Sequence, residues 1–376
     1  MKKKVLFAAT IAPHINAFHL PVLKFFQESG WETHVAAFAK NEEETQIPYC
    51  NCFHNTPFTR QPFTKRNVDA YFSLKKLIEE KEFDIIHCHT PVGGVLTRLA
   101  AKNMRRQGKT KVIYTAHGFH FFTGAPAANW LLYYPTEKIL SKYTDVLITI
   151  NKEDFERAKN FPAGKVEYVP GVGIDIEKIR STSVNRAGKR KEIGVPEDAY
   201  LLISVGELNK NKNHETAITA LSRIKDDKNI HYIIAGDGVL KNHLADLASN
   251  LGLENNVHLL GPRKDISQLL KTSDCFVFPS YREGLSVSLM EAMAAGLPVV
   301  CSGIRGNTDL IKDGVNGYLF KPSDAEELAQ SLKKVIAGDG QSAVSRYEDI
   351  EPFGADNVLR RMKKIYSDII GGTIRV

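Results

Sequence analysis

The sequence lacks the features of a membrane-spanning or disulfide-bonded protein. Its 376 residues contain no apolar run close to the ~20 residues that a membrane-spanning helix needs. The five cysteines are an odd number, are sparse for a chain of this length and include no Cys-x-x-Cys pair, which argues against a disulfide framework and a zinc ribbon. Reduced cysteines are typical of the cytosol, so we expect a cytoplasmic protein.

The first residues imitate a secretory signal peptide, but we interpret them as a strand. Lys2, Lys3 and Lys4 precede a short apolar stretch at 5–12, as a basic segment precedes an apolar one in a leader. The stretch then runs into Pro13 and a helical pattern without a convincing cleavage site. A first buried strand of a parallel sheet explains this pattern better.

The excess of positive charge lies in the first half of the chain. The formal net charge is +7, and residues 1–180 hold 25 Lys and Arg against 18 Asp and Glu. Residues 181–376 hold 25 of each kind, and 60–111 alone hold 12 basic and 5 acidic residues. Such a patch is typical of binding to nucleic acid, an anionic membrane or an acidic substrate. Because no nucleic-acid recognition motif occurs, we expect no nucleic-acid partner.

Strand and helix patterns alternate from one end of the chain to the other. Continuous apolar runs, for example at 145–150, indicate strands buried on both faces, which are typical of parallel sheets. We interpret the polar segment 181–192 as a linker that leads into an exposed turn. We therefore expect an α/β protein with two doubly wound domains, 1–180 and 181–353, that bind ligands at the carboxyl ends of their strands. The amphipathic segment 354–372 predicts a last helix that packs back on the first domain.

The segment 279–300 carries the most specific signal in the sequence. Glu283 follows an apolar strand, and a helix is expected to begin near Leu285 or Ser286. The free N–H groups and positive dipole end of a helix N-terminus suit a diphosphate. Glu291 lies just over two turns along this helix, where its carboxylate could accept hydrogen bonds from a ribose diol. Small residues follow Glu291 and imply tight packing, so this carboxylate needs a polar partner.

This segment resembles the carboxyl-domain signature of retaining glycosyltransferases of family 4, and similar stretches occur along nearly the full chain. The resemblance implies the GT-B fold, in which two Rossmann-like domains face each other across a cleft. It also implies that the first domain binds the acceptor and the second binds the nucleotide sugar. Stretches at 116–122, 130–135 and 169–175 look like those of bacterial enzymes of exopolysaccharide and capsule assembly, which extend a sugar on a lipid diphosphate.

The loop after the first strand of the second domain is similar to the family loop that neutralises the donor diphosphate. Lys212 falls on the position of the family lysine, whereas Glu207 stands where the family usually has an arginine. The resemblance thus implies only one of the two positively charged side chains that neutralise the donor diphosphate in the family. Asn209, Lys210 or Arg282 could supply the missing donor.

Two other strand ends of the second domain are similar to family loops. Gly236 and Gly238 allow a tight turn and close backbone approach. No further glycine follows at the spacing of a dinucleotide motif, so a nicotinamide or flavin site is not supported. Arg263 stands in the loop that reads the nucleotide base in the family, and an ordinary surface arginine is the alternative.

In the first domain, the resemblance places His117 at a strand end where the family has a histidine near the transferred sugar. His14 and Asn16 lie in the first loop, where many relatives carry glycines that contact the donor phosphate. Alternation along a strand puts His87 and His89 on one face, but no third metal ligand is evident. We interpret this pair as structural or acceptor-lining, because GT-B enzymes as a class require no catalytic metal.

These residues predict a retaining transfer of sugar from a UDP-sugar to a polyprenyl-diphosphate-linked glycan. Glu283, His117 and Lys212 are the expected catalytic residues, and the UDP-sugar is a substrate, so no cofactor or metal is expected. The expected nucleotide-sugar contacts are Glu291, Asn209, Lys212, Arg263, Arg282, Gly284, Leu285 and Ser286. The alternatives are an epimerase or phosphorylase on the same fold, and a non-catalytic protein that binds sugar or nucleic acid.

Two sets of residues predict contact with the membrane or with a lipid-linked acceptor. The first is basic and lies on the helix expected at 92–106: Arg98, Lys102, Arg105 and Arg106. The second is aromatic: the stretch 119–122, Trp130, Tyr133 and Tyr134. Leu131, Leu132 and Tyr134 are nevertheless expected in an ordinary core helix. We therefore expect a protein that associates peripherally with the inner face of the cell membrane, with simple solubility as the alternative role of the charge.

Overall fold

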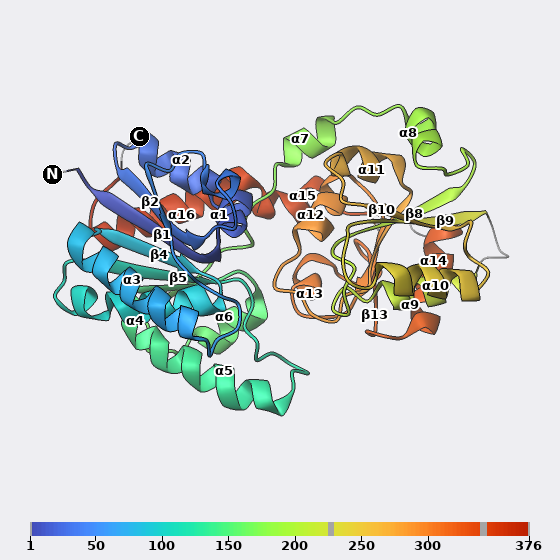
Figure 1. Ribbon diagram of the computed structural model, residues 1–376. Helices are drawn as coiled ribbons and strands as arrows, with labels where there is room; N and C mark the ends of the chain where they lie inside the picture. The colour runs from blue at the N-terminus through green and yellow to red at the C-terminus, as the bar shows by residue number, and fades with distance from the viewer. Residues whose placement is uncertain (1, 225–228, 339–343, 375–376) are drawn as a thin grey trace. The chain divides into compact units, whose positions relative to one another are not determined.

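The computed structural model describes residues 2–224, 229–338 and 344–374 (Figure 1). The chain forms two compact units. Unit 1 comprises Met1–Gly173 and Asp356–Val376, and unit 2 comprises Ile174–Ala355. The division follows Gly173 rather than residue 180, and the C-terminal segment belongs to unit 1.

Unit 1 is built on a seven-stranded sheet whose neighbouring strands all run parallel. The strand order is β3-β2-β1-β4-β5-β6-β7. The strands are β1 (Lys4–Ile11), β2 (Glu32–Phe38), β3 (Cys52–Asn55), β4 (Ile85–His89), β5 (Lys111–Ala116), β6 (Val146–Thr149) and β7 (Lys165–Tyr168). The order changes direction between β1 and β4, and ligands of doubly wound sheets bind outside the carboxyl ends at such a point.

Helices cover both faces of this sheet (Figure 1). Val5 and Phe7 of β1 belong to the core on one face, whereas Leu6 and Ala8 belong to the core on the other. Burial on both faces explains why this strand is a continuous apolar run, as predicted. The helices are α1 (Ala12–Phe18), α2 (Leu20–Glu28), α3 (Lys65–Lys81), α4 (Pro91–Arg106), α5 (Ala127–Leu140) and α6 (Lys152–Ala158).

The last helix, α16 (Ala355–Ile370), packs on the same face of the unit 1 sheet as α2 (Figure 1). Its buried residues are Val358, Met362, Ile365 and Tyr366. The Tyr366 ring meets that of Phe26 edge to face at 4.8 Å, and its hydroxyl lies 2.6 Å from Nδ1 of His87. The C-terminal segment is therefore part of the unit 1 core.

Unit 2 has a six-stranded parallel sheet in the order β10-β9-β8-β11-β12-β13. The strands are β8 (Tyr200–Val205), β9 (Ile230–Ala235), β10 (Val257–Gly261), β11 (Cys275–Phe278), β12 (Val299–Ser302) and β13 (Tyr318–Phe320). The helices are α7 (Ile176–Ser181), α8 (Arg186–Glu192), α9 (His214–Ser222), α10 (Lys241–Asn250), α11 (Ile266–Thr272), α12 (Val287–Ala294), α13 (Asn307–Leu310), α14 (Ala325–Ile336) and α15 (Tyr347–Ile350). Both units are thus Rossmann-like, as predicted.

The segment 181–192 is not an irregular linker. Its second half forms α8, and the side chain of Asn185 accepts a hydrogen bond from the backbone N–H of Gly188 at the start of that helix. Arg190 of α8 is buried and binds Asp274 at 2.7 Å. The polar residues that suggested a linker instead cap α8 and form ion pairs.

The structure also describes the membrane-span criterion and the cysteines. No helix among the described residues is long and apolar enough to cross a membrane. All five cysteines are free, and Cys88, Cys275 and Cys301 are buried.

Candidate active site

Lys212 and Glu283 form an ion pair at the carboxyl edge of the unit 2 sheet. Lys212 lies between β8 and α9, and Glu283 lies between β11 and α12. The Lys212 Nζ atom is 2.7 Å from Glu283 Oε1, and the two side chains are only 19% and 14% exposed. The same Nζ lies 4.8 Å from the centroid of the Phe278 ring. The structure therefore brings together two residues that the sequence predicted separately.

Hydrogen bonds hold the loop of Lys212 against the loop of Glu283. Asn209 Oδ1 accepts a bond from the backbone N–H of Lys212 at 3.0 Å. Asn211 donates from its side chain to the backbone oxygen of Arg282 at 2.9 Å, and its own carbonyl accepts from the N–H of Tyr281 at 2.8 Å. These asparagines shape the site through the backbone. The side chains of Glu207, Lys210 and Arg282 are exposed.

Two glycines let the loop after β9 approach the loop after β8, as predicted. A Cβ at Gly236 would overlap the carbonyl oxygen of Gly206, and a Cβ at Gly238 would lie 2.5 Å from that of Leu208. The backbone N–H of Leu208 donates to the carbonyl of Asp237 at 2.9 Å. Larger side chains at these positions would displace the loop that carries Lys212.

The helix α12 begins at Val287, close to the predicted start. Ser286 is its N-cap, and its Oγ accepts a hydrogen bond from the N–H of Leu289 at 3.4 Å. Leu285 and Ser286 are buried, and Gly284 is half-buried beside them. The N-terminus of this helix therefore lies next to the Lys212–Glu283 pair.

Glu291 lies along the same helix and is half-buried. Its carboxylate has no hydrogen-bond or ion-pair partner among the described residues. Burial raises the pKa of this carboxyl group above its ordinary value. The described residues therefore supply no hydrogen-bond or ion-pair partner for the Glu291 carboxylate, although its packing predicted one.

Arg305 is a site residue that we did not predict. It is buried in the loop after β12, and its Nε donates to the backbone oxygen of Glu283 at 3.1 Å. Gly306 follows with φ +81°, and a Cβ there would overlap the carbonyl oxygen of Gly284. The only signal in the sequence is an arginine next to a glycine just beyond an apolar strand.

Arg263 has partners within unit 2. Its guanidinium binds Asp265 at 2.6 and 2.8 Å and Glu192 at 2.6 Å. Hydrogen bonds from Arg263 and Lys189 hold the pKa of Asp265 below its ordinary value. These contacts link the loop after β10 to α8 and α11, and they explain this arginine without a nucleotide.

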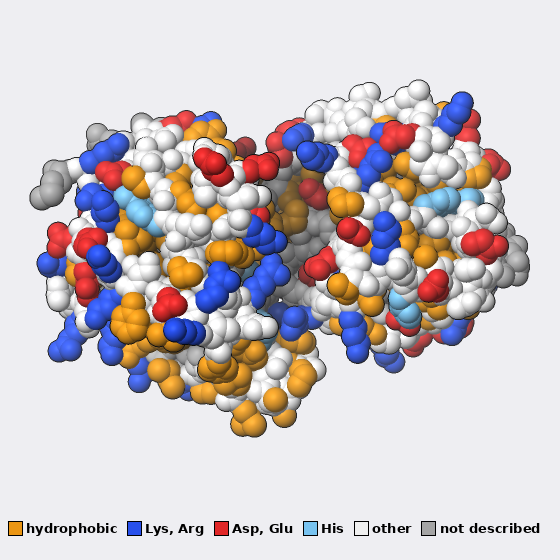
Figure 2. Space-filling model, viewed as in Figure 1, with side chains coloured by type: hydrophobic (Ala, Val, Ile, Leu, Met, Phe, Trp, Pro, Cys, Tyr) orange, Lys and Arg blue, Asp and Glu red, His pale blue; other side chains and the backbone are white. Residues whose placement is uncertain are grey.

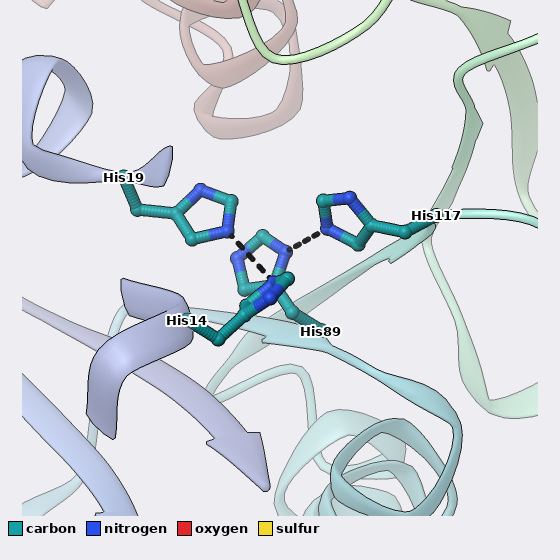
Figure 3. A group of neighbouring side chains, drawn as sticks. All are labelled: His14, His19, His89 and His117. Carbon is teal, nitrogen blue, oxygen red and sulfur yellow. Dashed lines mark hydrogen bonds between the residues drawn. The ribbon is translucent and has the colours of Figure 1, made fainter. Parts of the chain in front are cut away.

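Four histidines converge in unit 1, near the carboxyl ends of β4 and β5. They are His14, His19, His89 and His117, and one ring nitrogen of each lies within 4.8 Å of one ring nitrogen of every other (Figure 3). His14 lies on α1, and His19 separates α1 from α2. His89 ends β4, and His117 follows β5. We call this group the histidine cluster.

The rings of the histidine cluster are uncharged at neutral pH. Burial, with a smaller contribution from Arg60, lowers the pKa of His14 to about 4. Burial also lowers the pKa values of His19, His89 and His117 well below the ordinary value. Neutral imidazoles offer one donor and one acceptor each, which suits sugar hydroxyls.

His87 and His89 have different surroundings. Nε2 of His87 lies 2.8 Å from Thr115 Oγ1, and its Nδ1 contacts Tyr366, so both ring nitrogens are occupied. His87 is thus structural. His89 belongs to the histidine cluster, whose other members come from distant segments, and Asn16 lies exposed on α1 outside it.

The four basic residues expected to dock on lipid do not share one exposed face. Arg98 is fully buried, binds Glu137 at 2.8 Å and lies over the Tyr114 ring at 3.9 Å. Arg105 binds Asp145 at 3.0 Å. The docking hypothesis is therefore wrong for Arg98, and only Lys102 and Arg106 of the set are exposed.

Family models match both units. A model described as glycosyl transferase 4-like matches residues 4–151, and a model described as glycosyl transferases group 1 matches residues 185–350. EpsD of Bacillus subtilis (strain 168), which carries the name of a glycosyltransferase, is 44% identical over 339 residues, or 89% of this chain and 88% of EpsD. The chain belongs to the glycosyltransferases.

Two further similarities describe this glycosyltransferase more closely. An Escherichia coli protein named UDP-Gal:alpha-D-GlcNAc-diphosphoundecaprenol alpha-1,3-galactosyltransferase is 30% identical over 316 residues, which are 81% of this chain and 80% of that protein. The crystal structure of Anabaena Alr3699/HepE in complex with UDP and glucose covers 97% of this chain and 100% of that chain, with a TM-score of 0.79 and 21% identity. The fold of the glycosyltransferase is therefore GT-B, as the sequence predicted.

Proposed function

We propose that this glycosyltransferase moves a sugar from a UDP-sugar to a lipid-diphosphate-linked glycan with retention of anomeric configuration, in exopolysaccharide or capsule assembly. The Lys212–Glu283 pair beside the N-terminus of α12 carries the proposal. Glu291, which has no partner among the described residues, lies along the same helix. One cation, free N–H donors and two carboxylates suit a diphosphate, sugar hydroxyls and a ribose.

In this proposal the leaving diphosphate is neutralised by side chains and backbone, without a resident metal or cofactor. Lys212 supplies one charge, and the N-terminus of α12 supplies N–H donors and the positive end of its dipole. Arg305 supplies the second cation, because its guanidinium is anchored on the backbone of Glu283. Arg305 thereby takes the role of the family arginine, whose position Glu207 occupies in this chain.

Glu283 has two tasks that follow from its position. Before the donor binds, its carboxylate balances the charge of Lys212 at 2.7 Å. When the diphosphate takes over Lys212, the carboxylate can accept hydrogen bonds from the sugar hydroxyls. The site therefore exchanges one charged pair for another, which limits the desolvation cost of binding.

The relatives support the choice of donor, acceptor and stereochemistry. The name of the E. coli relative specifies UDP-galactose, an undecaprenol diphosphate acceptor and an α-linked product. UDP-galactose is itself an α-glycoside, so an α-linked product means retention. HepE was solved with UDP and glucose. The acceptor is assigned to unit 1, where the neutral rings of His117 and His14 can bind hydroxyls.

We assign the membrane-facing surface to α5. Leu131 and Leu132 were expected in the core, but they are 80% and 45% exposed. Figure 2 shows hydrophobic side chains gathered over this helix. The exposed apolar residues recur at helical spacing: Ala127, Ala128, Leu131, Leu132, Pro135 and Ile139. Lys138 is exposed in the last turn of the same helix, and a helix with such an apolar face and a basic residue is suited to the interface of an anionic membrane.

The first experiment measures UDP release and product formation over a panel of UDP-sugars with a polyprenyl-diphosphate-sugar acceptor. Lys212→Ala and Glu283→Gln should each lower kcat/KM at least a hundredfold, about 2.7 kcal/mol. The matched control is Lys241→Ala, because Lys241 is exposed on α10 outside the site. Full activity of Lys212→Ala would refute the donor site. Acceptor-independent turnover of the UDP-sugar would instead indicate an epimerase or hydrolase.

The second experiment measures sedimentation with vesicles that contain anionic phospholipid. Leu131→Asp should abolish binding, because it places a charge at the apolar face of α5. Val239→Asp is the control, since Val239 is 89% exposed in unit 2. Equal binding of both variants would contradict the assignment of α5.

A further inference from the structure

The spacing of the histidine cluster does not fit ordinary hydrogen bonds. Nε2 of His14 lies 3.3 Å from Nε2 of His19, and Nε2 of His117 lies 3.4 Å from Nδ1 of His89. Hydrogen bonds from N–H groups usually span about 2.7–3.2 Å. Zinc–nitrogen bonds of about 2.0–2.1 Å in a tetrahedron place the nitrogens about 3.3–3.4 Å apart. The separation of His14 and His19 equals that tetrahedral edge, and one ring nitrogen of His117 lies within 4.8 Å of a ring nitrogen of each.

The orientation of three rings agrees with a shared ion. The ring centroids of His14, His19 and His117 are 5.2, 4.7 and 5.7 Å apart, and the planes are inclined at 51°, 90° and 70°. Imidazoles on one tetrahedral zinc have centroids about 5 Å apart, because each ring lies just beyond a bond of about 2 Å. Figure 3 shows the rings of His14, His19 and His117 arranged around that of His89, with dashed lines from His14 to His19 and from His117 to His89.

His89 takes a different position in the cluster. Its ring stacks on that of His19 at 3.8 Å with an interplanar angle of only 26°. Two nearly parallel rings cannot both direct a lone pair in their own plane at one ion. His89 is fully buried, and its Nε2 has no hydrogen-bond partner among the described residues. Its Nδ1 lies 3.4 Å from Nε2 of His117, so His89 contacts the ligand set without belonging to it.

We propose that His14, His19 and His117 form a binding site for a divalent transition-metal ion of the zinc class. The ligand set is all imidazole, which suits zinc, copper or nickel and excludes the oxygen-seeking ions magnesium and calcium. Three protein ligands leave a fourth position open for water.

Other histidine groups in the chain show that this geometry is not general. In the group formed by Glu32, His34 and Cys52, His34 lies 2.7 Å from Glu32 and 2.9 Å from His54. His231 lies 2.9 Å from His258. These separations are those of hydrogen bonds, and both nitrogens of His34 are occupied. Among the contacts between two histidine rings in the described residues, the separations of 3.3 and 3.4 Å occur in the histidine cluster.

The proposal is tested on the full chain, stripped with a chelator and titrated with Co²⁺ while visible absorption is recorded. The wild type should bind one equivalent with the spectrum of tetrahedral cobalt, and Zn²⁺ should displace it. His14→Ala and His117→Ala should each weaken binding at least tenfold. His120→Ala is the matched control, because His120 lies in the same loop as His117, outside the cluster.

Two results would overturn the proposal: no stoichiometric binding by the wild type, or unchanged affinity when His14 and His117 are both replaced. Circular dichroism checks that each variant folds. If His117→Ala does not fold, His117→Asn takes its place in the titration. His19→Asn should weaken binding, whereas His89→Asn should retain it, and the reverse pattern would refute the three-ligand set. Binding is measured without nucleotide sugar, so failure here leaves the proposed transferase site unaffected.

Discussion

Replacing Glu291 by glutamine should make this protein more stable and a poorer binder of UDP. The side chain keeps its shape in Glu291→Gln, but the negative charge is lost. The carboxylate is half-buried without a partner among the described residues, so its charge has an uncompensated desolvation cost in the free protein. In the proposed complex, the same charge accepts two hydrogen bonds from the ribose.

The loss of affinity follows from the hydrogen bonds of the diol. A bond to a charged group contributes about 1.5–3 kcal/mol, and a neutral bond contributes about 0.5–1.5 kcal/mol. The amide keeps one good acceptor for two hydroxyls, so we expect a loss of about 1.5–3 kcal/mol. This corresponds to a UDP Kd that is roughly 10- to 100-fold weaker.

The pH dependence of stability has a definite sign. Burial raises the pKa of Glu291 in the folded state, so the folded chain binds more protons than the unfolded chain between the two pKa values. The free energy of unfolding contributed by this group therefore falls as the pH rises through that window. Glu291→Gln removes this contribution, and its Tm should exceed that of the wild type at neutral pH and approach it in acid.

Calorimetry with UDP and thermal melts test both expectations on the same samples. Glu254→Gln is the control, since Glu254 is exposed elsewhere in unit 2 and its replacement changes the net charge equally. A UDP Kd within a factor of two of the wild type would refute the assignment of Glu291 to the ribose. A lower Tm of Glu291→Gln at neutral pH would show that the carboxylate has a stabilising partner.

Three other perturbations have defined outcomes. Gly306→Ala should lower the free energy of unfolding by about 1–3 kcal/mol in urea and weaken UDP binding, because φ is +81° and a Cβ would overlap the carbonyl of Gly284. Glu137→Gln should cost about 3–5 kcal/mol in the same assay, since it leaves the buried charge of Arg98 without its carboxylate. Saturating zinc should inhibit transfer reversibly, because the ion and the sugar hydroxyl compete for His117; an unchanged rate in zinc-loaded enzyme would contradict that contact.

The strands that could be predicted are those buried on both faces. β1 and β6 are continuous apolar runs, and sequence alone places them within a residue or two. β3 and β7 were not predicted, because they are the edge strands of their sheet and are only half-buried. Their sequences, Cys-Phe-His-Asn and Lys-Val-Glu-Tyr, mix polar and apolar residues as a loop does.

One helix boundary also depended on local chemistry. The apolar spacing at 17–29 is that of a single helix, but α1 ends at Phe18, and α2 begins after His19 with Pro21 in its first turn. Proline lacks the N–H that would continue the preceding helix. The break places His19 in the histidine cluster. Because a continuous helix was expected there, His19 was not predicted as a residue of this cluster.

The residues of unit 2 that could be predicted follow apolar strands directly. Lys212 and Glu283 occupy loops whose positions are fixed by the strand pattern, so their meeting at one sheet edge follows from the fold. Arg305 could not be found in this way. One of its contacts is with the backbone of Glu283, and a backbone acceptor can belong to any residue type, so the sequence does not reveal it.

The basic excess of unit 1 shows why charge counts do not locate a surface. Arg98 and Arg105 contribute to the count, but Glu137 and Asp145 neutralise them within the fold. An apolar stripe is equally ambiguous, because burial and lipid contact both remove it from water. The opposite side of α5 excludes burial of the stripe: Glu137 is buried and binds Arg98, whereas Leu131 is exposed.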